Sequence, residues 1–295
     1  MDDLELIHSF LEVAETGSVT QAARRLNVTQ PALSRRLHRL ESALGAELFE
    51  RSRSGVALTE QGRFVQREGH AIVQHWSRMK DGVAALTGLE AGTIRIGGGA
   101  TAASFILPGA IAEFQGDHPG VLFHVKEAGS RDIEHEVAAE RLDLGIVTLP
   151  VHSEEFELRR LRTDRIVLVG SADHPLAKRS RIPVSALDGQ ELVGFESPSA
   201  IRQLIDGALR DAGVQVKVVM ELRSIPAILR MVAATHCLAF VSQMGVGSGV
   251  EAQDLRVLSV SGLKITRGLA VIRKRNRPMS PAAESFARRL RLGRG

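Results

Sequence analysis

Residues 18–37 read SVTQAARRLNVTQPALSRRL, and they decide how the N-terminal part of the chain folds. Small and apolar residues recur at one-turn spacing in the first half, which predicts a helix. A break follows, after which Thr29 can cap a second helix that tolerates Pro31 in its first turn. Two helices joined by a short turn are typical of a helix-turn-helix. On this stretch alone, an ordinary helical hairpin with a solvated charged face remains the alternative.

The second predicted helix leaves a polar face free, and its side chains suit the major groove of DNA. Glutamine can pair with adenine, arginine can pair with guanine through two hydrogen bonds, and serine tolerates either base. The residues that we expect to contact bases are Gln30, Pro31, Ser34 and Arg35. The residues that we expect mostly to contact phosphates or the minor groove are Arg36, Arg51 and Arg53.

The pattern extends well beyond this stretch. Its residues are Leu6-Ile7-x-x-Phe10-Leu11-x-Val13-Ala14-x-x-Gly17-Ser18, Gln21-Ala22-Ala23-x-x-Leu26, Gln30-Pro31-Ala32-Leu33-Ser34, Leu40-Glu41-x-x-Leu44-Gly45-x-x-Leu48-Phe49-x-Arg51 and Leu58-Thr59-x-x-Gly62. In this order they closely resemble the winged-helix domain of LysR-type transcriptional regulators, and a looser similarity continues to the C-terminus. The resemblance implies a sequence-specific DNA-binding regulator, not an enzyme, whose DNA bending and promoter activity respond to a small-molecule effector.

The resemblance also implies the domain organisation. An α+β winged helix-turn-helix is expected at 1–58, a linker and dimerisation helix at 59–87, and an α/β effector-binding domain at 88–295. The last domain is expected to have a periplasmic-binding-protein-like fold, with subdomain I at about 91–161 and 266–295 and subdomain II at about 162–265. Homodimers, paired into homotetramers, would bind double-stranded DNA, and RNA polymerase is a further expected partner.

Residues 51–58 are expected to form a β-hairpin wing with Gly55 at its turn. A wing can place a cationic side chain in the minor groove beside the reading helix. The family often has arginine just before the wing glycine, where this chain has Ser54. Arg53 is the neighbouring residue that could take over this contact.

A long helix should follow, because Thr59 can cap it and apolar residues then recur at alternating spacings of three and four. These residues are Val65, Ile72, Trp76, Met79, Val83 and Leu86. The stripe would form a coiled-coil seam of about three heptads. The resemblance favours a dimerisation helix over a helix packed on its own domain. At 86–92 the heptads stop and two glycines appear, which predicts a hinge.

From residue 93 onward, β-rich runs alternate with helical ones, which predicts an α/β domain with mainly parallel sheets. The expected strands are 93–97, 121–125, 142–147, 166–170, 191–195, 216–220 and 238–241, and the expected helices are 104–117, 130–140, 199–212, 224–234 and 280–292. The crossing of the chain between subdomains near residues 162 and 265 is implied by the resemblance alone.

Hydroxyl side chains follow several of these strands, at the sheet edge where ligands of open α/β domains collect. The residues expected to line an effector cleft are Thr101, Ser130, Thr148, Ser197 and Ser199. In LysR-type regulators the corresponding loops line the inducer cleft. Each hydroxyl alone could instead cap a helix.

Hydroxyls and helix N-termini suit a small anion such as a carboxylate. Arg202 and Arg223 lie near the same edge and could supply positive charge, with surface salt bridges as the alternative. Some relatives that bind aromatic acids have arginine where this chain has Thr148, which argues against assuming that ligand class. Residues 97–99 are all glycine but lack the G-x-G-x-x-G pattern of dinucleotide sites, so no cofactor is expected.

Composition narrows the class of protein further. Between residues 20 and 67, nine Arg or Lys stand against four Asp or Glu, an excess that suits phosphate contact. The basic stretch 256–295 is better explained as a solvated surface. The single Cys237 excludes an internal disulfide, the ten His lack metal-ligand spacing, and no catalytic grouping stands out. Without a signal peptide or an apolar run of about eighteen residues, a cytoplasmic protein with no membrane association is expected.

Two other classes compete with a specific regulator. One is a solute-binding or enzymatic α/β protein with an unrelated helical N-terminus, which would need a signal peptide or a catalytic grouping. The other is a nucleoid-type protein that binds DNA without sequence preference, which would not need two subdomains with a cleft.

Overall fold

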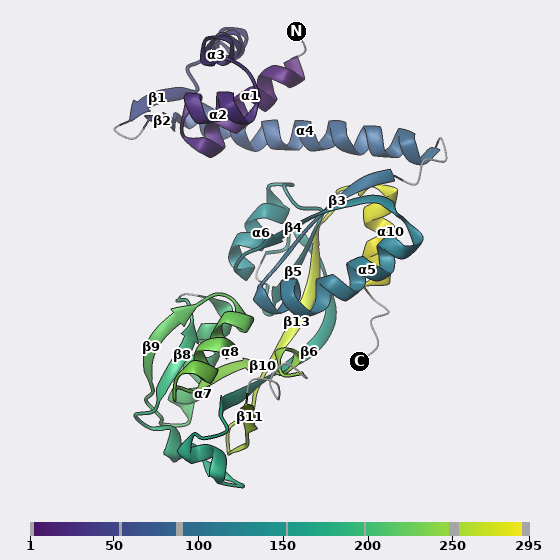
Figure 1. Ribbon diagram of the computed structural model, residues 1–295. Coiled ribbons are helices and arrows are strands. Elements are labelled where there is room, and N and C mark those ends of the chain that lie inside the picture. Colours follow the sequence, from purple (N-terminus) through teal and green to yellow (C-terminus); the bar gives the residue numbers. More distant parts are fainter. Residues whose placement is uncertain are drawn as a thin grey trace. The chain divides into compact units, whose positions relative to one another are not determined.

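The computed structural model of the chain describes residues 3–52, 55–86, 91–151, 153–197, 199–247 and 254–290. The chain divides into two compact units, the first formed chiefly by Met1–Gly88 and the second by Leu89–Ala138 and Leu142–Gly295 (Figure 1). Each unit has a hydrophobic core of its own.

The first unit is helical and carries a small β-hairpin. In chain order it contains α1 (Asp3–Thr16), α2 (Val19–Arg25), α3 (Gln30–Leu44), β1 (Phe49–Ser52), β2 (Gly55–Leu58) and α4 (Glu60–Leu86). Ser18 and Thr29 cap α2 and α3, since each hydroxyl oxygen accepts a backbone N–H three residues later at 3.4 Å. Between these helices Asn27 adopts a left-handed conformation with φ of 54°, which reverses the chain. The predicted helix-turn-helix is confirmed.

The predicted wing is also present, since β1 pairs antiparallel with β2. Arg53 and Ser54, which stand between β1 and β2 in the sequence, lie outside the described residues. Thr59 caps α4 by accepting the N–H of Gly62 at 2.9 Å. Gly62 packs so closely that an added Cβ would lie 2.1 Å from the carbonyl oxygen of Leu48. This close approach fixes the hairpin to the start of α4.

The helix α4 ends at Leu86, as the sequence predicts, and residues 87–90 of the expected hinge lie outside the described part of the chain. Val65 packs against the core of the first unit. The other seam residues whose side chains are described are exposed in the single chain: Ile72 by 46%, Trp76 by 42%, Met79 by 52% and Val83 by 58%. That α4 joins two copies of the chain stays a prediction.

The second unit combines one large mixed sheet with smaller ones. Its strands are β3 (Ala91–Gly98), β4 (Gly120–Glu127), β5 (Leu144–Thr148), β6 (Phe156–Ser171), β7 (Ile182–Pro183), β8 (Glu191–Phe195), β9 (Lys217–Leu222), β10 (Ala239–Ser242), β11 (Leu255–Leu258), β12 (Val260–Ser261) and β13 (Ile265–Lys274). Its main helices are α5 (Leu107–Asp117), α6 (Ser130–Ala138), α7 (Ala200–Asp211), α8 (Ile225–Ala234) and α10 (Pro281–Arg289), and a π-helical turn, η1 (Ala102–Ile106), leads into α5.

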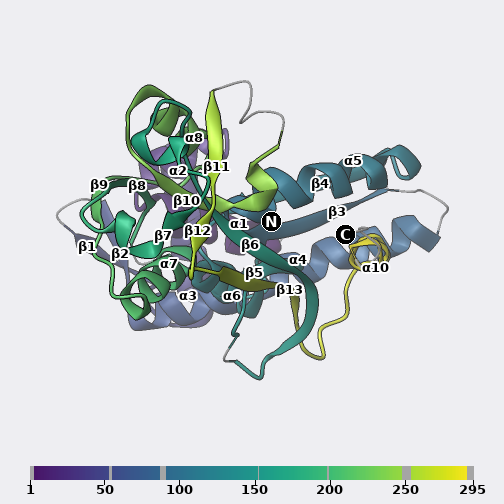
Figure 2. The same ribbon diagram turned by 90° about the horizontal axis from the view of Figure 1, so that it is seen from below.

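The large sheet has the strand order β10-β6-β13-β5-β3-β4, with β11 also paired to β6. Only the β3–β4 and β3–β5 pairs of this sheet are parallel, whereas β13–β5, β13–β6, β10–β6 and β11–β6 are antiparallel. The two smaller sheets, β8–β9 and β7–β12, are parallel, so the described strand pairs of this unit are four parallel and four antiparallel. The prediction of mainly parallel sheets is therefore wrong, because two long strands, β6 and β13, run in opposite directions through the unit (Figures 1 and 2).

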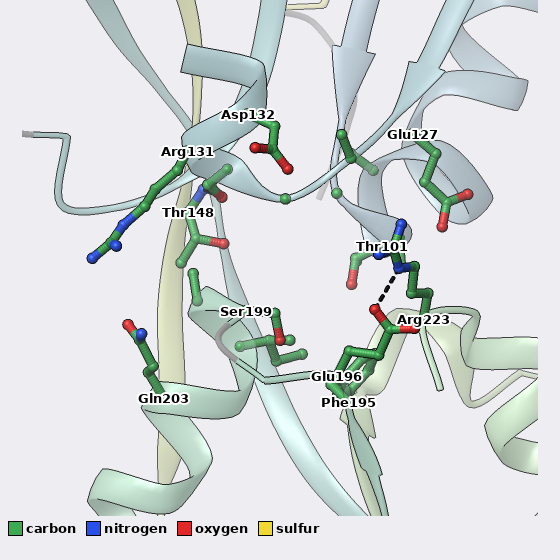
Figure 3. A pocket seen from close by; sticks show the side chains of 18 of the residues that line it. Thr101, Glu127, Arg131, Asp132, Thr148, Phe195, Glu196, Ser199, Gln203 and Arg223 are labelled. Carbon is green, nitrogen blue, oxygen red and sulfur yellow. Dashed lines mark hydrogen bonds and ion pairs between the residues drawn. The ribbon is translucent and has the colours of Figure 1, made fainter. Parts of the chain in front are cut away.

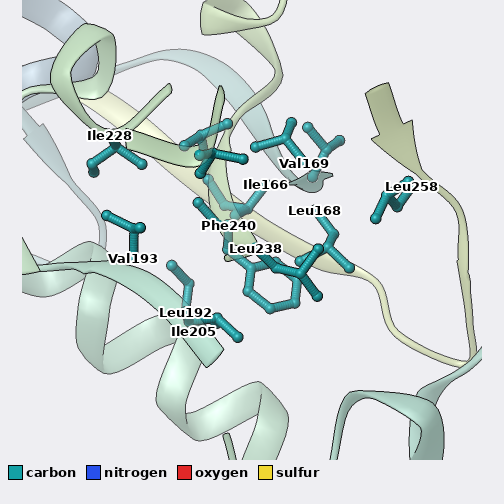
Figure 4. Packing of buried hydrophobic residues seen from close by; sticks show 14 of the residues in the cluster. Ile166, Leu168, Val169, Leu192, Val193, Ile205, Ile228, Leu238, Phe240 and Leu258 are labelled. Atoms are coloured by element: carbon teal, nitrogen blue, oxygen red, sulfur yellow. The ribbon is translucent and has the colours of Figure 1, made fainter. Parts of the chain in front are cut away.

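These two strands connect two halves of the unit. We call the half with β3, β4, β5, α5, α6 and α10 subdomain I, and the half with β8, β9, β10, α7 and α8 subdomain II. In subdomain I, α5 and α10 cover one face of the sheet around Phe114 and Phe286, and α6 covers the other around Ile133. In subdomain II, Leu168 and Phe240 pack with residues of β8, α7 and α8 (Figure 4). The ends of β6 and β13 thus lie in separate cores.

Candidate functional site

The residues expected to read DNA bases lie on one exposed face of α3. Gln30, Pro31, Ser34 and Arg35 are all exposed. The opposite face of α3, which includes Leu33, is buried in the core of the first unit. The spacing of these four residues at one helical turn brings them together, so this face is free to enter a groove.

The residues expected at phosphates are placed differently. Arg36 is mostly buried, and its guanidinium donates to Glu5 at 2.6 Å and to Ser9 at 3.3 Å. Arg36 therefore joins α3 to α1. A guanidinium already paired with a carboxylate also gains less from binding a phosphate. Arg51 lies in β1, but its side chain and the whole of Arg53 lie outside the described residues.

A pocket of about 500 Å³ lies between subdomains I and II of the second unit. Six of the seven predicted effector residues line it: Thr101, Ser130, Thr148, Ser197, Ser199 and Arg223. Figure 3 shows Thr101, Thr148 and Asp132 on the side of subdomain I, facing Ser199, Gln203 and Glu196 on the side of subdomain II. Residues distant in sequence thus meet at the strand ends, as expected for an open α/β sheet.

Arg202, the seventh predicted residue, is not part of the pocket lining. Its guanidinium donates to Asp206 at 2.8 Å, to Glu221 at 2.8 Å and to the carbonyl oxygen of Phe195 at 2.9 Å. The bond from Arg202 is also the main reason why the pKa of Glu221 is lowered. Arg202 therefore fastens α7 to β8 and β9, which corresponds to the salt-bridge alternative.

Arg223 does line the pocket, and it forms an ion pair with Glu196 at 2.5 Å (Figure 3). Both side chains are substantially exposed, at 79% and 42%, so the pair contributes little to stability. The hydrogen bond that Arg223 donates to Glu196 is the main cause of the raised pKa of Arg223, with smaller contributions from Asp132 and Glu127 of subdomain I. Both Asp132 and Glu127 also line the pocket, so charges of both signs surround it.

Arg267, on β13, is a pocket residue that the sequence reasoning missed. Its Nε atom donates to Asp164 at 2.8 Å, and its Nη2 and Nη1 atoms donate to the hydroxyls of Thr101 at 2.6 Å and Thr148 at 3.3 Å. Ser242 donates to the other oxygen of Asp164 at 2.7 Å. This network joins both crossing strands, β6 and β13, to the pocket hydroxyls and to the end of β10.

The ion pair at its centre is buried. The side chains are 6% exposed for Arg267 and 1% for Asp164. Burial lowers the pKa of Arg267, and Asp164 opposes that effect, so the guanidinium keeps its charge at neutral pH. The sequence around Arg267 reads ITRGL and carries no local signal of this role, because the partner Asp164 lies 103 positions earlier in the chain.

The pocket hydroxyls are oriented by the protein as donors. Thr101 and Thr148 accept from Arg267, and the Ser130 oxygen accepts the backbone N–H of Thr148 at 3.0 Å. A hydroxyl that accepts still has its own O–H to donate. The Ser199 hydroxyl is buried and has no hydrogen-bond partner among the described residues. Thr101 and Ser199 do not cap helices through their side chains, so the pocket offers donors to a ligand.

No described helix has the length and apolar composition needed to cross a membrane. No group of three or more His, Cys, Asp or Glu in the described ranges could hold a metal ion. Cys237 is a buried free thiol.

Two family profiles match the chain. The profile described as a bacterial regulatory helix-turn-helix protein of the lysR family matches residues 4–63. The profile described as a LysR substrate binding domain matches residues 87–293. The two matches coincide with the helix-turn-helix of the first unit and with the pocket-bearing second unit.

Individual proteins are similar over most of their length. A probable RuBisCO transcriptional regulator of Cyanidium caldarium is 30% identical over 292 residues, which cover 97% of this chain and 91% of that protein. CbnR, a LysR family transcriptional regulator whose structure was solved with its target DNA, is 20% identical in sequence over 99% of both chains. The two structures superimpose with a TM-score of 0.72, which shows that they share a fold. The regulatory domain of CcmR from Synechocystis PCC6803, in complex with 2-PG, is 26% identical with a TM-score of 0.63, covering 68% of this chain and 96% of that one.

Proposed function

The chain belongs to the LysR-type family of bacterial transcriptional regulators, and we propose that it reads one DNA sequence with α3 and responds to a small anion in its pocket. As a member of this family it is a regulator with a DNA-binding helix-turn-helix and an effector-binding domain, not an enzyme.

The orientation of the pocket hydroxyls carries the effector proposal. Thr101, Thr148 and Ser130 each accept a hydrogen bond from the protein and keep an O–H to donate, and Arg267 lies behind two of them. A ligand with several acceptor oxygens and negative charge would satisfy these donors best, as a carboxylate or a phosphate does. Arg267 is already paired with Asp164, which leaves little uncompensated positive charge. We therefore expect the effector to place a single anionic group at this end of the pocket.

Effector binding would act on DNA through the two crossing strands. Arg267 on β13 is bonded to Asp164 on β6, and these two strands connect the subdomains. An anion that shifts the position of Arg267 would therefore also shift these strands. A ligand that binds the closed arrangement more tightly would shift the population toward it. This closure would change the position of one dimer relative to the other, and so the angle by which they bend the DNA.

Assembly is the third part of the proposal. The exposed seam of α4, with Ile72, Trp76 and Met79, supports a dimerisation helix, because such a stripe is stable only when buried. Dimers would pair into tetramers, contact RNA polymerase at the promoter and work in the cytoplasm, where the chromosome lies.

Selection of binding sites from a random duplex pool tests the DNA part. Enrichment of a dyad with half-sites about one helical turn apart is expected. The Arg35→Ala variant should weaken specific binding by roughly 1–3 kcal/mol and relax the preference at one base position per half-site. An unchanged preference would remove Arg35 from base reading. Recovery of no motif, with affinity that falls steeply in salt, would instead indicate nucleoid-type binding.

Thermal unfolding with a panel of anions tests the effector part. Phosphate, sulfate and small mono- and dicarboxylates are each added to the full chain at matched ionic strength. One class should raise the melting temperature of the second unit, and Thr101→Val should abolish that rise without weakening DNA binding. An equal rise in Thr101→Val, or no rise with any anion, would overturn the proposed effector class.

A further inference from the structure

A second cavity lies within subdomain I, separate from the effector pocket. Its volume is about 470 Å³, close to that of the first, and no residue lines both. It lies between α10 and the paired strands β6 and β13. A cavity of this size is within the range of small-molecule sites in proteins.

The floor of this cavity is apolar. Leu144 and Val271 of the sheet are 0% and 4% exposed, and Ala287 of α10 is 7% exposed. Met279, before α10, is half-buried at the same place. Contact with these side chains would remove the hydrocarbon part of a ligand from water.

The rim is rich in arginine. Glu157 accepts two bonds from Arg273, from Nε at 2.6 Å and Nη2 at 2.5 Å, and both end on the same carboxylate oxygen. Arg159 donates to the carbonyl oxygen of Ala287 at 2.7 Å, which holds β6 against α10. Five charged residues line the cavity: Arg159, Arg273, Arg288, Glu157 and Glu284.

Two groups on this rim still have donors to offer. In the described part of the chain, Nη1 of Arg273 makes no hydrogen bond, and the guanidinium of Arg288 makes neither a hydrogen bond nor an ion pair. Arg288 is exposed in the last turn of α10, and Arg273 lies on the neighbouring β13. The three arginines and two glutamates leave one excess positive charge beside an apolar floor.

We propose that this cavity is a second ligand site, specific for a small organic monoanion with an apolar body, such as an aryl or alkyl carboxylate. The carboxylate binds Arg288 and Nη1 of Arg273, which present planar pairs of donors that match its two oxygens. The hydrocarbon part lies over Val271, Ala287 and Met279. The site stands on residues other than those of the effector pocket, so it is independent of the effector proposed there.

Fluorine NMR of the full chain with 4-fluorophenylacetate tests this site. The uncharged 4-fluorophenylacetamide has the same body without the charge and should bind at least tenfold more weakly. Arg288→Glu, a reversal on an exposed helical surface, should weaken binding of the acid at least tenfold. Arg210→Glu is the matched control, because Arg210 is likewise exposed in the last turn of a helix, α7, and does not line the cavity.

Two further variants separate the two cavities. Ala287→Met fills the second cavity from its floor and should also block the acid, whereas Thr101→Val alters only the effector pocket and should leave binding unchanged. The proposal is overturned if the wild type does not bind the acid at millimolar concentration, or if the acid and the amide bind equally. Loss of binding in Thr101→Val with full binding in Arg288→Glu would also overturn it, by assigning the acid to the first pocket.

Discussion

Replacing Arg267 by methionine should destabilise the second unit strongly. The substitution keeps most of the side-chain volume but leaves the Asp164 carboxylate, 1% exposed, with Ser242 as its remaining side-chain donor. Breaking one partner of a buried ion pair typically costs about 3–5 kcal/mol in the free energy of unfolding. For a unit of this size each kcal/mol lowers Tm by roughly 2–4 °C, so a fall of roughly 6–20 °C is expected.

Calorimetric melting of the full chain measures this effect, with the two units followed as separate transitions. Arg210→Met is the control, because Arg210 is exposed at the end of α7 and its loss should change Tm little. The double variant Arg267→Met with Asp164→Leu should regain most of the lost stability, because a buried pair can often be exchanged for apolar residues at little cost. This regain distinguishes an unpaired buried charge from a simple loss of packing.

The reasoning would be refuted by a fall in Tm of less than about 3 °C for Arg267→Met, since even the lowest expected loss exceeds that. It would also fail if the double variant were as unstable as the sum of the two single variants. Additivity would mean that the two side chains do not interact in solution as they do in the structure.

Four further substitutions have defined outcomes. Gly62→Ala should destabilise the first unit by more than about 2 kcal/mol because its Cβ would meet the Leu48 carbonyl, whereas Gly82→Ala should stabilise α4 by about 0.5–1 kcal/mol. Burial lowers the pKa of His174 below 6.5, so the unfolded chain takes up the proton more readily and stability should fall below pH 6.5; His174→Asn should flatten that dependence. Trp76→Glu in the exposed seam of α4 should shift sedimentation from dimer to monomer.

Contrary outcomes are defined for Gly62→Ala, His174→Asn and Trp76→Glu. Equal melting of Gly62→Ala and wild type would show that α4 can shift away from the hairpin. An identical fall in Tm between pH 7.5 and 5.5 in His174→Asn would assign the pH dependence to other groups. For the seam, Glu68→Ala on an exposed part of the same helix is the control, and an unchanged sedimentation coefficient for Trp76→Glu would place the dimer interface elsewhere.

The helices of the first unit could be predicted because their signals are local. The cap at Thr29, the break at Asn27 and the apolar spacing of α4 each act within one or two turns of the same helix. The seven expected strands were found for the same reason, since each is a short apolar run. Family resemblance supplied the rest of the architecture.

The first half of β6 and the whole of β13 were missed, because their stability comes from pairing with each other. Residues 156–165 read FELRRLRTDR, where charged side chains outnumber apolar ones and hide the strand. They pair with Ile265–Lys274, about a hundred positions later in the chain, and no local pattern shows such a partner. Arg267 was missed for the same reason, since its role depends on Asp164.

Local sequence also predicted some pocket residues, whereas others depend on partners far away in the chain. Five hydroxyl residues were placed at the pocket because the ends of strands can be read from the sequence. The sequence could not show which of the two predicted arginines, Arg202 or Arg223, lines the pocket with these hydroxyls. Both follow a strand of the same subdomain, and they differ only in the residues around them. Arg202 forms ion pairs with Glu221 and Asp206 and does not line the pocket, whereas Arg223 does.

The strand β13 carries alternate residues that line both cavities, first Arg267 and Leu269, then Val271 and Arg273. Side chains along a strand alternate between two faces, so one inserted or deleted residue within this stretch would turn the arginines away from their cavities and their apolar neighbours out of the core. Mutations that change chain length should therefore be tolerated in the surface loops of this regulator and eliminated within β13. Among its descendants, the distance between these two arginines is expected to persist while loop lengths diverge.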